Sequence, residues 1–421
     1  MSEDAGPLAG LRIVDVTSVF LGPFATQILG DLGAEVIKVE PLEGELTRAA
    51  TPLRNPGMGA VFMGLNRNKR SLSLDLKSAQ GREILLRLCG TADMFLHNMR
   101  AAAIERLGLG YEAVRAVRPD IVYCLACGFS EAGPYAGRPA YDDVIQAASG
   151  MVALQGRSTG EPAYIATAMA DKVAGLTVVY ALLAAILHRN RTGRGQFIEV
   201  PMFETNVAFL AVEHLSGASF DPPIGGAGYQ RLLTPHRRPH RTTDGMIGVI
   251  PYTDRHWQAL FLLAGQPELV ADARFASIEA RSRHFPALYA WLAETMATRS
   301  TAEWLDLLAR AEIPATPVLS PDDWLTDPHL RQVGLFETRH HPTEGEIRVV
   351  RNPVTFSDSP ASLRRPTPVC GQDSEAVLRE LGYTAQEITV LVENKIVRKG
   401  DVEGCPDVSH RPLDQGRPRD A

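Results

Sequence analysis

Two cysteines have the spacing of a chemically active pair. Cys124 and Cys127 form a C-x-x-C motif, which is typical of redox thiols and of one half of a zinc site. The pair lies in a strand-like run, 121–127, in which an odd separation directs the two thiols to opposite faces. The chain has five cysteines and no second pair that would complete a zinc site. We interpret them as reduced core thiols, with redox or metal binding as the alternative, and we expect no metal site.

A single carboxylate stands directly before a long apolar run. Asp171 precedes the helical pattern 172–188, and a carboxylate in that place is typical of a helix N-cap, where it accepts backbone N–H bonds. The apolar stretch 173–187 is shorter than the roughly 20 residues that cross a bilayer, and charged or polar residues bracket it. We therefore expect a buried core helix that begins at Asp171.

A glycine-rich stretch and a basic cluster follow farther along the chain. Residues 217–228 are rich in Gly and Pro without periodicity, which is typical of a linker or a mobile loop. A cluster of basic residues comes next, which we interpret as solvated surface, with contact to a small anion as the alternative. Its members are Arg231, His236, Arg237, Arg238, His240 and Arg241.

Strand and helix patterns alternate through the first third of the chain. A strand at 11–16, a turn at Gly22-Pro23, a helix to Leu32 and a strand at 35–39 form a β-α-β start. The order repeats as a helix at 80–89, a strand at 94–97, a helix from Ala102 and a strand at 121–125. This alternation predicts an α/β fold with a parallel sheet that helices cover on both faces. The first turn lacks G-x-G-x-x-G, so we expect no conventional NAD site.

Composition excludes several classes of protein. The 421 residues are 45% hydrophobic and 22% charged, which is ordinary for a globular chain of two or three domains. The net charge of −6 indicates neither a nucleic-acid nor a membrane partner. Residues 1–7 lack a secretory signal pattern, so we expect a cytoplasmic protein. A helix-rich segment at 257–311 and a helix-turn-helix pattern at 373–397 complete the expected elements.

Ordered sequence blocks identify a family. The blocks read GLRIVD at 10–15, LGAEVIKVE at 32–40, NKRSLSLDLK at 68–77, RLGLGY at 106–111, RPAYD at 138–142 and TGRGQ at 192–196. With IPATPV at 313–318 and ELGY at 380–383, they resemble the CaiB/BaiF family of class III coenzyme A transferases over roughly 8–397. The resemblance implies a Rossmann-like large domain built from both chain ends, a smaller α+β domain, and an interlocked homodimer.

The resemblance also implies domain boundaries. We expect residues 1–215 to form the N-terminal part of a large CoA-binding domain, and 216–230 to form a linker or glycine-rich loop. Residues 231–315 are expected to form the small domain. Residues 316–400 return to complete the large domain, and 401–421 are expected to be a flexible tail.

Asp171 takes a second role from the resemblance, which is compatible with a helix cap. The family pattern places its nucleophilic aspartate there, so that the carboxylate attacks an acyl-CoA thioester and forms a mixed anhydride, followed by an aspartyl-CoA thioester. The glycines Gly225, Gly226 and Gly228 resemble a lid whose N–H groups would stabilise an oxyanion, with a plain linker as the alternative. No tightly bound cofactor is implied, because CoA and acyl-CoA are substrates.

CoA contacts carry over from the family motifs to residues in five segments. Lys77 and Arg106 suit phosphate anchoring, although a solvated charge is the simpler interpretation of Lys77, and strand packing that of Leu74 and Leu76. The full set is Phe20, Leu21, Leu74, Asp75, Leu76, Lys77, Asn98, Met99, Arg106, Pro139, Ala140, Tyr141 and Asp142.

The sequence departs from the family pattern, and alternatives to a transferase stay open. Residues 97–100, His-Asn-Met-Arg, stand where Glu-Asn-Phe is usual, and Pro41 replaces a CoA-binding arginine of some members. The related α-methylacyl-CoA racemases need a second acid/base where this chain has Tyr141, whose ordinary pKa of about 10 makes it a poor base. A non-catalytic acyl-CoA-binding protein is the alternative of another class. We expect a transferase that uses an acyl-CoA donor, with succinyl-CoA as a candidate, and a free carboxylic acid.

Overall fold

The chain forms two compact units in a computed structural model that describes residues 6–400. The first unit combines Met1–Ile145, Thr167–Asn206 and Arg331–Ala421, and the second combines Gln146–Ala166 with Val207–Leu330. The second unit therefore includes more of the chain than the expected small domain, 231–315. The expected flexible tail, 401–421, lies outside the described residues.

A seven-stranded sheet forms the centre of the first unit, in the order β12-β3-β2-β1-β4-β5-β6. All neighbouring strands are parallel except β12, which runs antiparallel to β3. The strands are β1 Arg12–Val16, β2 Glu35–Glu40, β3 Lys69–Leu74, β4 Met94–His97, β5 Val122–Cys127, β6 Gln196–Pro201 and β12 Val397–Arg398. The prediction of an α/β fold with a mainly parallel sheet is confirmed.

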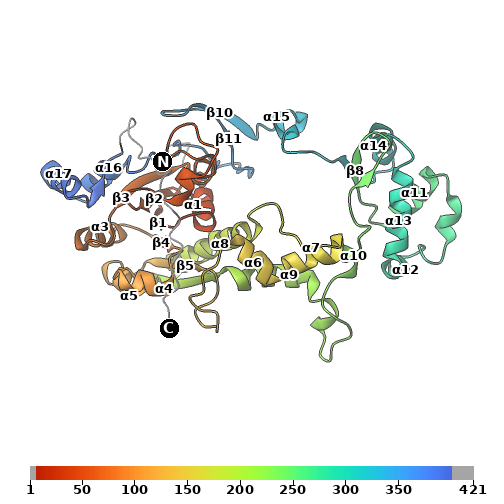
Figure 1. Cartoon of the computed structure of the whole chain (residues 1–421), viewed down its shortest axis with the longest axis horizontal. Coiled ribbons are helices and arrows are strands. Elements are labelled where there is room, and N and C mark those ends of the chain that lie inside the picture. The colour runs from red at the N-terminus through yellow and green to blue at the C-terminus, as the bar shows by residue number, and fades with distance from the viewer. Residues whose placement is uncertain (1–5, 401–421) are drawn as a thin grey trace, which may run out of the picture. The chain divides into compact units, whose positions relative to one another are not determined.

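Helices cover both faces of this sheet because alternate strand residues point to opposite sides. In β1, Ile13 packs with α1 and α8, whereas Val14 packs with the helices of the other face. Figure 1 shows α1 and α8 to the right of the strands and α3 and α5 to the left. The helices are α1 Leu21–Asp31, α2 Ala60–Asn66, α3 Ala79–Cys89, α4 Ala101–Arg106, α5 Tyr111–Val117, α8 Met169–Thr192, α16 Ser374–Glu380 and α17 Ala385–Glu393.

The sequence patterns missed three strands of this sheet, β3, β6 and β12. Strand β3 begins with two adjacent charged residues, Lys69 and Arg70, yet every residue from Lys69 to Leu74 is buried. Its charges are tolerated because they are paired: Lys69 with Asp15, and Arg70 with Glu35 and Glu380. The strand β12 has only two residues, which is too short for a pattern to reveal.

Helix α8 is long and apolar enough to cross a membrane by length and composition, and 39% of its most apolar window is buried. One face packs on α1, β5 and β6 through Ala174, Val178, Leu182 and other small or apolar residues. The expectation of a buried core helix is thus met on that face. The opposite face leaves Leu176, Tyr180 and Leu187 between 53% and 64% exposed.

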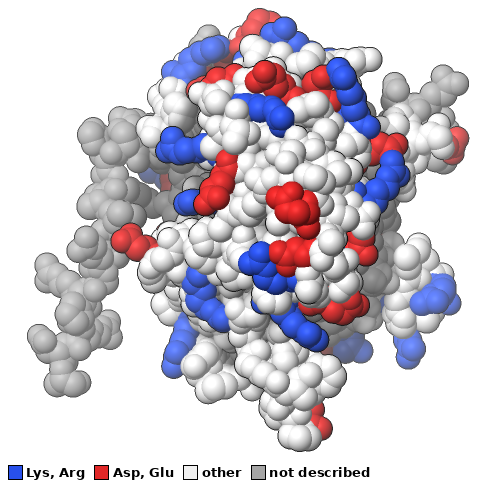
Figure 2. Space-filling model, turned by 90° about the vertical axis from the view of Figure 1, so that its right-hand side faces the viewer, with Lys and Arg blue, Asp and Glu red and all other residues white. Residues whose placement is uncertain are grey.

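The second unit has its own core around Trp257, Leu260, Leu292 and Trp304. It holds the three-stranded sheet β7-β8-β9, formed by His240–Arg241, Met246–Val249 and Ala315–Pro317. Its helices are α7 Met151–Thr159, α10 Gln230–Leu233, α11 Asp254–Leu263, α12 Ile278–Arg283, α13 Phe285–Met296 and α14 Thr301–Arg310. Acidic and basic side chains are interspersed on the face drawn in Figure 2.

The remaining elements either pass between the units or complete the first. Helices α6, α9 and α15, at Asp142–Ser149, Met202–His214 and Pro328–Gln332, each have residues in both units. The antiparallel hairpin of β10 and β11, at Phe336–His341 and Gly345–Val350, belongs to the first unit. Short 3-10 turns lie at Leu46–Ala49, Ser216–Ser219, Pro267–Ala271 and Asp323–Leu325.

Candidate active site

The strand order creates a crevice beside β1 and β4. The chain passes from β1 outward to β3 and then returns to place β4 on the other side of β1, so the loops after β1 and β4 leave the sheet in opposite directions. Ligands of such open sheets bind at this switch point, beyond the carboxyl ends of the strands. Residues 18–21 and 98–100 follow these two ends and line a cavity of about 250 Å³.

Asp171 lines the same cavity, but not as a helix cap. Helix α8 begins at Met169, and its N-cap is Ala168, which has no side chain that could accept a hydrogen bond. The expectation that Asp171 caps the helix is therefore wrong. Instead the backbone N–H of Asp171 donates to Oδ1 of Asp142 at 2.9 Å. Asp142, the first residue of α6, thus binds the first turn of α8 through its backbone. The Asp171 carboxylate does not take part in this bond, and Asp171 lines the cavity.

The surroundings of Asp171 shift its ionisation. Burial, and second the negative charge of Asp142, raise the pKa of Asp171 to about 7. Both forms of the carboxyl group are therefore populated near neutral pH. A carboxyl group with this pKa in a cavity is suited to act as a nucleophile or as a general base.

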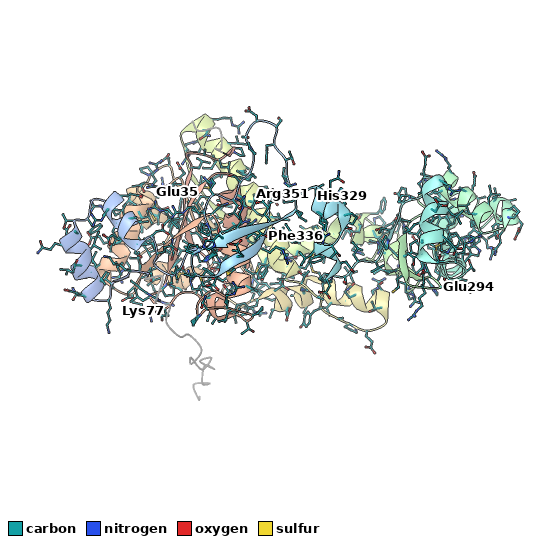
Figure 3. The ribbon with its side chains drawn as sticks, turned by 90° about the horizontal axis from the view of Figure 1, so that it is seen from above. Glu35, Lys77, Glu294, His329, Phe336 and Arg351 are labelled. Carbon is teal, nitrogen blue, oxygen red and sulfur yellow. The ribbon has the colours of Figure 1, made fainter. Side chains whose placement is uncertain are left out.

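A second cavity, of about 600 Å³, adjoins the first. Ser18, Leu46 and Met99 line both cavities. The second cavity is also lined by Lys77 and Arg106, whose side chains are exposed. Lys77 lies at the outer margin of the first unit in Figure 3. The cavity that holds Asp171 therefore adjoins the cavity that holds Lys77 and Arg106.

The structure brings most of the expected CoA-binding residues into these two cavities. The first is lined by Phe20, Leu21, Asn98, Met99, Pro139, Ala140 and Tyr141, and the second by Leu74, Asp75, Leu76, Lys77, Met99 and Arg106. Asp142 contacts Asp171 instead, as described above. The amide of Asn98 accepts a hydrogen bond from the N–H of Ser18 at 3.0 Å and donates to its carbonyl at 2.8 Å. Its side chain is therefore engaged with the protein.

Other expected residues lie elsewhere. Gly225, Gly226 and Gly228 belong to the second unit, and the N–H of Gly228 donates to the carbonyl of His214 at 2.7 Å. Their role as a lid stays a prediction. In the basic cluster of the same unit, His240 is buried, so solvated surface is the wrong interpretation for that residue.

The two cysteines of the C-x-x-C motif have different surroundings. Cys124 is buried in the core, and Cys127 lines the cavity of Asp171. Burial, and second the nearby carboxylate of Glu199, raise the pKa of Cys127 well above its usual range, so its thiol is unreactive at neutral pH. Within residues 6–400, no group of three or more His, Cys, Asp or Glu side chains is placed to hold a metal ion.

The side chains of the first cavity that sequence reasoning missed include Arg100, Arg138 and Leu46. Both arginines are exposed, and the ion pairs among residues 6–400 include neither of them. Arg138 lies over the ring of Tyr135, 4.1 Å from its centroid. A signal existed for Arg100, because it follows β4 closely and the ends of switch-point strands flank the ligand.

Comparison with known proteins identifies the family. The model of CoA-transferase family III matches residues 8–374. The chain belongs to this family. This CoA-transferase is 33% identical over 402 residues to succinyl-CoA:glutarate CoA-transferase of Mus musculus, covering 94% of this chain and 92% of the relative. It is 31% identical over 416 residues to formyl-CoA:oxalate CoA-transferase of Shigella sonnei (strain Ss046), covering 93% and 99%.

Two solved structures are similar in fold to this family III CoA-transferase. A CaiB/BaiF family protein from Brucella suis is 32% identical, with a TM-score of 0.75, over 90% of this chain and 100% of its own. Rv3272 from Mycobacterium tuberculosis is also 32% identical, with a TM-score of 0.77, over 89% and 99%. The likeness therefore extends over both units of the chain.

The raised pKa of Asp171 predicts a pH-dependent effect on stability. Because the folded pKa, about 7, exceeds the ordinary 3.8, ionisation of Asp171 disfavours the folded state. The contribution of protonated Asp171 to the free energy of unfolding is fully present below about pH 4 and is lost as pH rises through 7. We expect Asp171→Asn to match the wild type at pH 4 and to be more stable by about 1–3 kcal/mol at pH 8.

Thermal unfolding from pH 4 to pH 8.5 measures this difference in stability. Asp143→Asn is the control, because Asp143 is an exposed acid in the first turn of α6. A stability difference for Asp171→Asn that does not change with pH would contradict the raised pKa.

Proposed function

We propose that this enzyme moves CoA from an acyl-CoA donor to a free carboxylic acid through covalent intermediates on Asp171. The observation that carries the proposal is the place of Asp171: a partly buried carboxylate in the switch-point cavity, which adjoins a second cavity lined by Lys77 and Arg106. An acyl-CoA has its reactive thioester at one end and its phosphates at the other. The two cavities offer complementary groups at both ends.

The chemistry proceeds by four acyl transfers. The Asp171 carboxylate attacks the donor thioester carbonyl, forming a mixed anhydride and releasing CoA thiolate. The thiolate attacks the aspartyl carbonyl of the anhydride, which releases the donor acid and forms an aspartyl-CoA thioester. The acceptor carboxylate then attacks this thioester, forming a second anhydride and again releasing CoA thiolate. Attack by CoA on the acceptor carbonyl gives the new acyl-CoA and restores Asp171.

Binding of CoA would place its phosphates near Lys77 and Arg106. Hydrogen bonds between these cations and phosphate oxygens are charge-assisted and therefore stronger than neutral ones. The pantetheine arm would then pass Ser18, Leu46 and Met99, which line both cavities, to reach Asp171. Of the residues on this path, Lys77, Met99 and Arg106 are among those that the family resemblance assigned to CoA. The path also explains why their positions in the sequence are so dispersed, since the loops after β1, β3 and β4 all contribute.

The acids that we propose as substrates carry a second carboxylate. Arg100 and Arg138 line the cavity of Asp171 and face it with positive charge. A guanidinium binds a carboxylate through paired hydrogen bonds. The names of the relatives include succinyl-CoA, glutarate and oxalate, which fits this class. We propose succinyl-CoA as the first donor to test.

Replacing the nucleophile gives the decisive test. Asp171→Asn preserves the shape of the side chain but cannot form the anhydride, so we expect loss of CoA transfer with CoA affinity nearly unchanged. In the wild type incubated with succinyl-CoA, hydroxylamine should convert the activated carboxyl group to a hydroxamate on the peptide that contains Asp171. Appreciable transfer by the Asn variant, or a label on another carboxylate, would contradict the proposal. Asp143→Asn should keep full transfer.

Removing the proposed phosphate anchors should weaken binding of the donor. We expect Lys77→Ala and Arg106→Ala to raise KM for the acyl-CoA more than they lower kcat, because these residues are remote from the reacting carbonyl. The loss of binding free energy for the acyl-CoA should be about 1–3 kcal/mol for each contact that is removed. Arg115→Ala, an exposed arginine on α5, serves as the control. Normal CoA affinity in both anchor variants would show that the nucleotide binds elsewhere.

We also propose that the enzyme is an interlocked homodimer, as the family resemblance implies. The exposed apolar face of α8, with Leu176, Tyr180 and Leu187, supports this proposal, because soluble proteins rarely leave such faces uncovered. Sedimentation at nanomolar concentration should detect dimer and no folded monomer. A compact monomer that retains activity would refute it.

A further inference from the structure

The turn between β1 and α1 separates the two cavities and is held by side chains. Residues 17–20 carry the chain from Val16 to the start of α1. Ser18 lines both cavities, Thr17 lines the second, and Val19 and Phe20 line the first. A shift of this turn would therefore change the passage that leads to Asp171.

Hydrogen bonds from buried charged groups fix the two ends of the turn. The N–H of Val19 donates to Oε2 of Glu45 at 2.9 Å, and Nζ of Lys38 donates to the carbonyl of Thr17 at 2.9 Å. The N–H of Thr17 also donates to Asp15 at 2.9 Å. Together with the two bonds between Asn98 and Ser18, these contacts bind each residue from 17 to 19 by a side chain.

Val19 adopts a conformation that needs such support. Its φ of +69° lies in the left-handed region, which is unfavourable for a β-branched residue. Backbone strain of this kind persists only where the surrounding structure enforces it, and it gathers at functional sites. The Glu45 carboxylate, bonded to the N–H of this residue, is the group that enforces it here.

The ion pair behind the turn is deeply buried. Nζ of Lys38 lies 3.6 Å from Oε2 of Glu45, and their side chains are 0% and 3% exposed. Removing two charges from water is costly, and a buried pair of this kind is often no more stabilising than apolar residues of the same size. Its presence under the turn is therefore better explained by what it holds in place than by a gain in stability.

We propose that Glu45 and Lys38 are positioning residues for the transfer reaction: they fix the Thr17–Phe20 turn and so set the passage by which the thioester reaches Asp171. This inference rests on the proposed function. Leu46, which follows Glu45, also lines both cavities. The same ion pair is thus next to two residues that line both cavities, Ser18 and Leu46.

Two variants test the inference. Glu45→Ala removes the acceptor for the Val19 N–H, and we expect kcat to fall about 10- to 100-fold with little change in CoA affinity, since small misplacements cost that much. Glu45→Gln retains an acceptor and should restore most of the rate. Hydrogen exchange at the amides of residues 18 and 19 should be faster in Glu45→Ala than in the wild type. An unchanged kcat, or unchanged exchange, in Glu45→Ala would overturn the inference.

Two further variants separate positioning from simple loss of stability. Arg67→Met disrupts another buried ion pair of the first unit, 2.6 Å from Arg67 to Asp31, and should lower the melting temperature without changing kcat or exchange in the turn. If Glu45→Ala does not fold, Lys38→Met/Glu45→Gln removes both charges together and leaves no unpaired buried charge. It should again lower kcat and hasten exchange, because the carbonyl of Thr17 loses its donor.

Failure of this inference can be distinguished from failure of the proposed function. A wild-type enzyme that transfers CoA, together with an equally active Glu45→Ala variant, contradicts only the positioning role. A wild type that transfers CoA to no acid contradicts the proposed function. In that case hydrogen exchange still shows whether Glu45 holds the turn. Exchange in Glu45→Ala that is as slow as in the wild type would contradict this positioning role.

Discussion

The amide of Asn98, bonded to both backbone groups of Ser18, joins the two loops on which the site depends. The reversal of strand order between β1 and β4 sends these loops apart, and a gap at this point is a consequence of the topology. A single side chain that spans the gap converts it into a cavity with fixed walls. Asp171 is then brought to this cavity by α8, which packs against α1.

The raised pKa of Asp171 implies a cost in stability, and the chemistry proposed for this residue offers a reason for that cost. A solvated aspartate would be fully ionised at neutral pH but would be a weak base and a weak nucleophile. Burial and the neighbouring Asp142 raise its pKa to about 7, close to the pH at which a catalytic carboxylate works best. Asp142 acts on Asp171 in two ways. Its carboxylate accepts a hydrogen bond from the Asp171 N–H, and its negative charge raises the pKa of the Asp171 carboxyl group.

The sheet was more readily predicted than the site. Helix α3 follows from periodicity, because its apolar residues face one core, and strand β4 follows from a short apolar run that is buried on both faces of the sheet. The buried strand β3 could not be found in this way, since its lysine and arginine are neutralised by acids that are distant in sequence, among them Asp15, Glu35 and Glu380. Family blocks supplied many of the residues of both cavities but not Leu46 or Arg100, and the roles of these residues in catalysis stay predictions.

The same limit explains why sequence reasoning gave Asp171 the wrong structural role and overlooked Glu45. A pattern shows that a carboxylate stands beside an apolar run, but the helix begins two residues earlier, and its first turn is bound by Asp142, 29 positions away. Glu45 lies in an irregular segment in which no periodicity distinguishes it from a solvated acid. Its role becomes visible only when folding buries it beside Lys38 and under the N–H of Val19. Buried charges such as Lys38 and Glu45 can therefore act on backbone geometry, which a sequence pattern does not show.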